Sequence, residues 1–106
     1  MTPAYPKLFE PIRIGELQLS NRIVMTSMHT RIEQEPNAAE RLSAFYRERV
    51  EGGVGLIITG GYAPSEAGCI EQGSACLKDE TSLPFHQAVV DSVHEARGLI
   101  CMQILH

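Results

Sequence analysis

The feature that most constrains the fold is a set of three short apolar runs that alternate with two amphipathic segments. The apolar runs span residues 23–26, 54–59 and 99–105, and they are rich in β-branched residues. Short apolar runs of this kind are typical of strands that are buried on both faces of a parallel sheet. The sequence therefore predicts three parallel strands joined by right-handed helical crossovers.

The first amphipathic segment follows Asn37, which with Glu40 forms a capping-box pattern. Apolar residues then recur at three- and four-residue spacing until the pair Gly52 and Gly53 interrupts the pattern. They are Leu42, Phe45, Tyr46 and Val50. This spacing predicts a helix of about 14 residues with one solvated face.

The second amphipathic segment begins near Ser82 and Pro84, which are typical of a helix start, and it ends at Gly98. Its predicted apolar face consists of Phe85, Ala88, Val89, Val93 and Ala96. Two histidines on this helix, His86 and His94, are expected to face solvent. Neither lies in a metal-binding motif, so no metal site is predicted.

A short hairpin is predicted ahead of the first strand. Apolar residues alternate at Ile12, Ile14, Leu17 and Leu19 around a turn at Gly15. Alternation around a glycine-containing turn is the signature of two antiparallel strands. The whole prediction is thus an α/β fold of hairpin, strand, helix, strand, helix, strand.

Composition excludes several classes of protein. The chain has 106 residues, 43% of them apolar and 21% charged, which fits a single globular domain over residues 1–106. Its net charge of −4 argues against binding to nucleic acid or to an anionic membrane. No apolar run is long enough for a membrane helix, and residues 1–10 lack the basic segment followed by an apolar segment that is typical of a leader. The expected compartment is therefore the cytoplasm. Three cysteines without CxxC spacing are expected to be free thiols.

Two loops are expected to form a ligand site. Residues 27–36 and 60–81 both leave the carboxyl ends of predicted strands, which is the edge where α/β folds bind ligands. The chain also stops at His106, directly after a strand and without a helix to cover it. We therefore expect these residues to be part of a larger fold.

Several residues at this edge carry candidate chemistry. Ser27, Met28 and His29 follow the first strand, and Gly60 and Gly61 follow the second. Three interpretations stay open for His29: a proton donor, a contact to a bound planar heterocycle, and a loop histidine without a task. The glycine pair permits the backbone to approach a ligand closely, although paired glycines are also ordinary turn residues.

The most informative single residue is Gln103, because it interrupts an otherwise apolar strand. A buried amide must find hydrogen-bond partners, and its donors and acceptor suit the edge of a pyrimidine-like ring. A bond to a neighbouring strand or to a buried water is an equally good explanation. His106, at the end of the same strand, has the same two interpretations.

Other site types find little support. No GxGxxG or GxxxxGK[ST] motif is present, so Rossmann and P-loop nucleotide sites are disfavoured. Residues 31–36 are too acidic to serve as a flavodoxin-like phosphate loop. Cys69 and Cys76 lie in the long loop without an evident base, so ordinary loop thiols are the better interpretation.

Taken together, five segments resemble the N-terminal portion of the old yellow enzyme family of flavin-dependent oxidoreductases. The resemblance extends almost from end to end of the chain. The segments are residues 8–11, 19–25, 27–30, 56–61 and 103–106. The form Ser27-Met28-His29-Thr30 is most similar to the NADPH-dependent 2,4-dienoyl-CoA reductase branch.

The resemblance implies the N-terminal part of a (β/α)8 TIM barrel: a hairpin that closes the bottom, the first three strands and two helices. By position, Ser27, Met28 and His29 are implied to contact the FMN ring. Gly61 is implied to let the backbone approach the ring, and Gln103 to bond its pyrimidine edge. His106 belongs to the family's third-strand motif.

The implied activity is the reduction of an activated alkene, such as an enoyl or dienoyl thioester, by NADPH through FMN. The acid tyrosine, the phosphate site, an iron-sulfur cluster and FAD are implied to belong to sequence outside these residues. The alternative is a catalytically inactive partial barrel that folds by assembling with itself or with a complementing chain.

Overall fold

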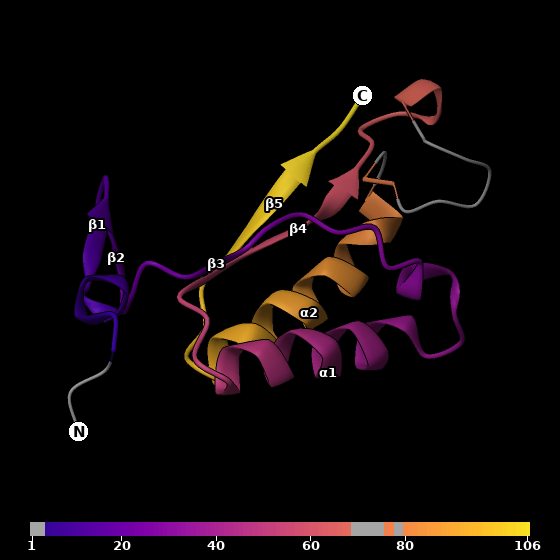
Figure 1. Ribbon diagram of the computed structural model, residues 1–106. Helices are drawn as coiled ribbons and strands as arrows, with labels where there is room; N and C mark the ends of the chain where they lie inside the picture. The colour runs from indigo at the N-terminus through magenta and orange to yellow at the C-terminus, as the bar shows by residue number, and fades with distance from the viewer. Residues whose placement is uncertain (1–3, 69–75, 78–79) are drawn as a thin grey trace.

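The computed structural model describes residues 4–68, 76–77 and 80–106, and it has the predicted order of hairpin, strands and helices (Figure 1). The strands are β1 (Ile12–Ile14), β2 (Leu17–Leu19), β3 (Val24–Met25), β4 (Leu56–Tyr62) and β5 (Ile100–Ile104). The α-helices are α1 (Ala38–Glu51) and α2 (Leu83–Glu95). Four single-turn helices accompany them: η1 (Pro6–Phe9), η2 (Ile32–Gln34), η3 (Glu66–Gly68) and η4 (Glu80–Ser82).

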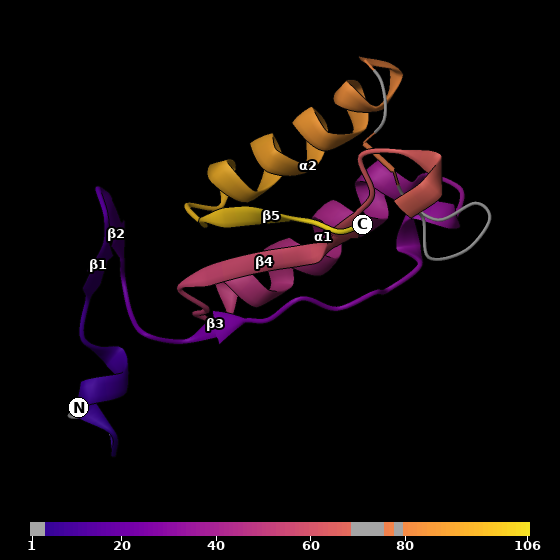
Figure 2. The ribbon, with the colours of Figure 1, turned by 90° about the horizontal axis from the view of Figure 1, so that it is seen from above.

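A three-stranded parallel sheet forms the centre of the molecule, in the order β3-β4-β5. Helices α1 and α2 pack against each other and cover the same face of this sheet (Figures 1 and 2). The core between helices and sheet consists of Leu42, Tyr46, Ile57, Val89 and Val93. These are positions that the periodicity predicted to face inward, with the exception that Ala88 is exposed rather than buried.

Among the described residues no helix covers the opposite face of the sheet, as expected for three parallel strands with two crossover helices, and residues 99–105 are therefore not buried on both faces. Ile100 packs against the core, whereas Cys101 is exposed and Ile104 is 56% exposed. Side chains alternate between the faces of a strand, so Cys101 and Gln103 share the face opposite Ile100. Gln103 therefore lies on the uncovered face, where it is half-buried.

The start of α1 also differs from the prediction. Asn37 is in the left-handed region with φ 57°, and its side chain makes no capping hydrogen bond. Capping residues normally have extended backbone angles that direct the side chain toward the helix amides. Burial of Leu42 and Tyr46 against the sheet, rather than a capping box, thus stabilises this helix.

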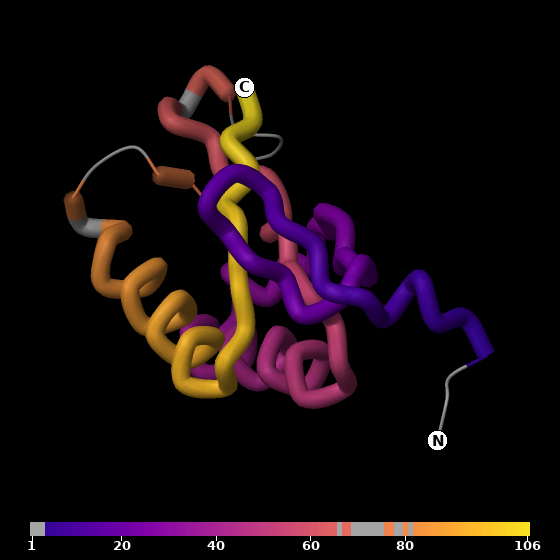
Figure 3. Tube along the Cα trace, turned by 90° about the vertical axis from the view of Figure 1, so that its left-hand side faces the viewer, coloured from indigo at the N-terminus to yellow at the C-terminus, as the bar shows by residue number. Residues whose placement is uncertain are grey.

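The hairpin β1–β2 is antiparallel and lies near the amino end of β3, away from the carboxyl ends of the parallel strands (Figures 1 and 2). Viewed end-on in Figure 3, it stands in front of the sheet. Its projection gives the molecule its longest dimension, 48 Å against 25 and 22 Å. The turn uses Gly15 with φ 61°, a conformation that favours glycine. The hairpin is thereby kept apart from the candidate site.

Asn21 joins the start of β3 to the turn between α1 and β4. It is 9% exposed, its Nδ2 donates to the Gly53 carbonyl at 2.6 Å, and its Oδ1 accepts the Ile23 amide at 2.9 Å. A Cβ on Gly55 would lie 2.6 Å from Asn21 Oδ1, so glycine is required for this close approach. One side chain therefore sets the spacing of two strand starts.

We expect Asn21→Ala to lower the free energy of unfolding by roughly 2–3 kcal/mol, because two backbone groups lose their partner. Urea unfolding followed by circular dichroism measures the change. Asn37→Gly is the control, since Asn37 is exposed, makes no capping bond and has a backbone conformation that glycine accepts. Equal stability of the Asn21 variant and wild type would show that these bonds do not hold the turn.

Candidate functional site

Ser27 and Gln103 meet at the carboxyl ends of the strands. The Ser27 hydroxyl donates to Gln103 Oε1 at 2.7 Å across 76 residues of sequence. Ser27 follows β3 and Gln103 belongs to β5, so this bond spans the end of the intervening strand β4. Two residues proposed separately from the sequence are thus direct neighbours.

The sequence predicted that the second strand ends before the glycine pair. This prediction is wrong, because β4 continues through Gly60 and Gly61 to Tyr62. A Cβ on Gly60 would lie 2.7 Å from the Met28 carbonyl oxygen. A Cβ on Gly61 would lie 2.6 Å from Leu105 Cδ2 and 3.2 Å from Gln103 Oε1. Glycine is therefore required by the close approach of neighbouring strands.

Thr59 was missed by the sequence analysis, although a hydroxyl in an apolar strand is a usable signal. The register between β4 and β5 shifts between Ile58 and Gly61. Within this irregularity, the buried Thr59 hydroxyl accepts a hydrogen bond from the backbone N–H of Gln103 at 3.1 Å. The same hydroxyl donates to the Gly60 carbonyl at 2.9 Å. Thr59 thus holds the backbone of Gln103 at the shift.

The five candidate cofactor residues all gather at this edge. Met28 is 54% exposed and His29 is exposed, and both lie beside Gly60. Among the described residues, none accepts a hydrogen bond from Gln103 Nε2. The amide therefore presents two unused donors on the uncovered face of the sheet, and this donor set fits the carbonyl edge of a flavin.

His106 lies at the end of the third strand, beside η3. A Cβ on Gly68 would lie 3.1 Å from His106 Cα and 3.2 Å from its Cδ2. The terminal histidine therefore packs against the backbone of the loop that follows β4.

A second cluster, absent from the sequence analysis, joins Glu33, Tyr62 and His86. The Tyr62 hydroxyl donates to Glu33 Oε2 at 3.0 Å, and the Tyr62 ring meets His86 edge-on with centroids 4.6 Å apart. The three side chains line a hollow of 180 Å³ together with Phe85. The prediction that His86 faces solvent is wrong, because only 9% of it is exposed; His94 is exposed as expected.

Burial controls the acid–base properties of this cluster. Desolvation raises the pKa of the Tyr62 phenol, and the charge of Glu33 adds to the effect. Desolvation also raises the pKa of Tyr46 to about 12. The pKa of His86 is lowered by burial, which outweighs the opposing influences of a Cys76 backbone hydrogen bond and Glu33. His86 is consequently neutral at pH 7.

This lowered pKa predicts a loss of stability in acid. Below the ordinary value of 6.5 the unfolded chain protonates His86 while the folded chain resists protonation. The unfolded state then binds more protons, so the free energy of unfolding falls as the pH drops through 6.5. We expect His86→Gln to lose less stability than wild type between pH 7.5 and 5.5 in urea unfolding. His94→Gln, the exposed control on the same helix, should follow wild type; identical slopes for all three proteins would refute the prediction.

The cysteines differ from expectation. Cys76 is disulfide-bonded, so it is not a free thiol. Cys101 is free and exposed. Cys69 lies outside the described residues. Within residues 4–68, 76–77 and 80–106, no three His, Cys, Asp or Glu side chains group as metal ligands, and no helix is long and apolar enough to cross a membrane.

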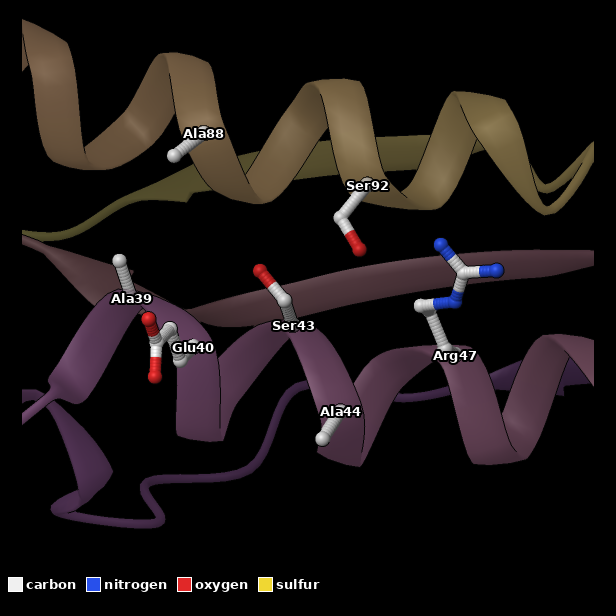
Figure 4. Close-up of a pocket in the computed structure, with 7 residues that line it drawn as sticks. All are labelled: Ala39, Glu40, Ser43, Ala44, Arg47, Ala88 and Ser92. Carbon is white, nitrogen blue, oxygen red and sulfur yellow. The ribbon is translucent and has the colours of Figure 1, made fainter.

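A larger hollow of 390 Å³ lies between α1 and α2 (Figure 4). It is lined by Ala39, Glu40, Ser43, Ala44, Arg47, Ala88 and Ser92. These side chains come from the helices and none comes from the strand ends. The groove is therefore separate from the candidate site.

The chain belongs to a family of flavin oxidoreductases. Residues 7–106 match the NADH:flavin oxidoreductase / NADH oxidase family. The chain is 37% identical over 97 residues to a metal reductase of Desulforamulus reducens, covering 92% of this chain and 14% of that protein. It is 36% identical over 108 residues to an NADH oxidase of Thermoanaerobacter brockii, covering 96% of this chain and 16% of that protein.

Solved structures agree with this assignment. The old yellow enzyme from Trypanosoma cruzi superimposes with a TM-score of 0.84 at 26% identity, covering 98% of this chain and 28% of that one. A 2-naphthoyl-CoA reductase shares the fold with a TM-score of 0.85 at 24% identity, covering 96% of this chain and 16% of that one. The chain is thus an α/β part of the architecture of old yellow enzymes.

The similar proteins are considerably longer than this chain. It spans between 14% and 30% of the length of curated relatives such as the metal reductase and an NADPH dehydrogenase of Listeria welshimeri. The curated relatives that it matches include an NADH oxidase and an NADPH dehydrogenase.

Proposed function

We propose that this chain forms part of the FMN site of an NAD(P)H oxidoreductase that reduces an activated alkene, such as a 2,4-dienoyl thioester. The observation that carries the proposal is the Ser27–Gln103 hydrogen bond beside Gly61, which builds a polar site at the carboxyl ends of three strands. Ligands of parallel α/β folds bind at this edge. Membership of the flavin oxidoreductase family identifies the ligand class.

Each candidate residue has a role that follows from its position. Gln103 donates through Nε2 to a carbonyl oxygen of the flavin pyrimidine ring, while Ser27 holds Oε1 and so fixes the orientation of the amide. Met28 and His29 contact the ring with exposed side chains. Gly61 leaves room for the Leu105 side chain and for Gln103 Oε1, and so lets Gln103 keep its position at the strand end. Bound FMN supplies hydride transfer between NAD(P)H and the substrate.

The finer assignment to dienoyl thioesters and NADPH rests on sequence. Ser27-Met28-His29-Thr30 has the form that is typical of the dienoyl-CoA reductase branch. The exposed imidazole of His29 adds a hydrogen-bonding group beside the ring site. A thioester carbonyl polarises the conjugated alkene and makes it an acceptor of hydride.

The test is an FMN titration followed by anaerobic turnover. We expect the protein to quench FMN fluorescence with saturable 1:1 binding, to be reduced by NADPH and to be reoxidised by a 2,4-dienoyl-CoA. Native mass spectrometry of the same sample reports chain mass and assembly. A flavin-free protein assembled with itself, with no quenching at 100 µM FMN (a concentration about a hundredfold above a micromolar dissociation constant), would replace the proposal with the inactive partial-barrel alternative.

A further inference from the structure

The segment that carries Met28 and His29 is not held by the sheet. Strand β3 pairs with β4 only through Val24 and Met25, so the backbone beyond Met25 leaves the ladder. Met28 and His29 have exposed side chains, which cannot fix their own backbone by packing. The backbone of Met28 and His29 lies against Gly60, and contacts on either side of the segment hold it there, of which Ser27–Gln103 is the first.

The second anchor is Glu33. Thr30 Oγ1 accepts the Ile32 amide at 3.2 Å and lies 3.5 Å from Glu33 Oε1, which closes a tight turn after His29. Glu33 Oε2 accepts the Tyr62 hydroxyl at 3.0 Å, so the turn is bonded to the end of β4. Ile32 packs against the core beside it.

Tyr62 is a rigid partner for this bond. It is 1% exposed, lies in β4 and meets the ring of His86 from α2 edge-on. A phenol held on two sides has little rotamer freedom left to lose, and a hydrogen bond to a carboxylate is stronger than one between neutral groups. Glu33 thus connects a loop without ladder bonds to a buried side chain at the end of β4.

We infer that Glu33 is a positioning residue for the flavin site: its bond to Tyr62 holds the turn at Thr30 and so fixes the backbone of Met28 and His29 against Gly60. The inference rests on the proposed function for the identity of the ligand, and it adds the part of the site that orients the ligand-facing segment. Glu33 and Tyr62 act through this segment, without contacting the flavin themselves.

The experiment is a double-mutant cycle with Tyr62→Phe, which removes one hydroxyl, and Glu33→Ala, read out by FMN titration. Each single variant should bind FMN about fivefold to tenfold more weakly, and the double variant no more than twofold more weakly than the weaker single, because both break one bond. Glu33→Gln retains an acceptor and should stay within twofold of wild type. Glu95→Ala is the control: this exposed carboxylate pairs with Arg47 at 3.5 Å, far from the strand ends, and its loss should not change FMN affinity.

Hydrogen exchange of the protein without FMN separates positioning from global stability. In Tyr62→Phe, the amides of residues 28–30 should exchange faster while those of α1 stay protected. Unchanged exchange at residues 28–30, or unchanged FMN affinity in both single variants, would overturn the inference. A wild-type protein that binds no FMN would instead overturn the proposed function, and that result is visible before any variant is made.

Discussion

Replacing Gly60 by alanine is expected to weaken FMN binding at least tenfold and to lower the free energy of unfolding by roughly 1–3 kcal/mol. The new Cβ would lie 2.7 Å from the Met28 carbonyl oxygen, a backbone atom that cannot rotate away. Gly60 lies beyond the β3 pairing of β4 and within the register shift against β5, so the clash must be relieved by a shift of the backbone at Gly60 and Met28. The proposed ring contacts of Met28 and His29 move with it.

Fluorescence titration with FMN and urea unfolding measure the two effects of Gly60→Ala separately. Gly52→Ala is the matched control, because Gly52 has φ −75° and its nearest Cβ contact is 3.3 Å, at the end of α1. That variant should retain wild-type FMN affinity. Wild-type affinity in the Gly60 variant would show that the position of Met28 does not matter for the flavin.

Gln103→Leu is expected to weaken FMN binding about tenfold to a hundredfold, since an unpaired polar partner costs roughly 1–3 kcal/mol. Leucine has a similar size, so the strand should keep its packing and the free energy of unfolding should change by less than about 1 kcal/mol. Ser27→Ala should have a smaller effect of about twofold to fivefold, because Ser27 only orients the amide.

The FMN titration of Gln103→Leu needs a control that makes the same glutamine-to-leucine substitution away from the site. Gln87→Leu supplies it: Gln87 is exposed on α2 and bonds Asp91 at 2.8 Å, away from the strand ends. Its FMN affinity should equal that of wild type. If Gln103→Leu also binds FMN as wild type does, the amide does not contact the flavin and Gln103 serves only to hold Ser27.

Local sequence patterns predicted the helices, the strands and their order, because the apolar spacing that defines each element lies within that element. The spacing of Leu42 and Tyr46 predicted the buried face of α1, and the apolar run around Ile57 predicted the central strand. The prediction from helix periodicity was wrong at His86. This histidine is buried where the ring of Tyr62, 24 residues earlier, packs edge-on against it. No local pattern contains that contact.

The candidate site was predictable in its residues and less so in its physical causes. Gln103 stood out as a polar residue in an apolar strand, and the structure pairs it with Ser27. The sequence leaves two interpretations open for Gly60 and Gly61, close approach of a ligand and ordinary turn residues, whereas in the structure Met28 and Leu105 crowd them. The Glu33–Tyr62 bond joins residues 29 apart, and sequence alone offers no reason to pair them.

The most direct test of the account is a crystal structure of the protein with FMN bound. The account predicts that the isoalloxazine ring lies across the carboxyl ends of β3, β4 and β5. Gln103 Nε2 should lie about 3 Å from a pyrimidine oxygen, and Ser27 should still donate to Gln103 Oε1. A flavin ring bound elsewhere, with Gln103 Nε2 left without contact to it, would contradict the central claim.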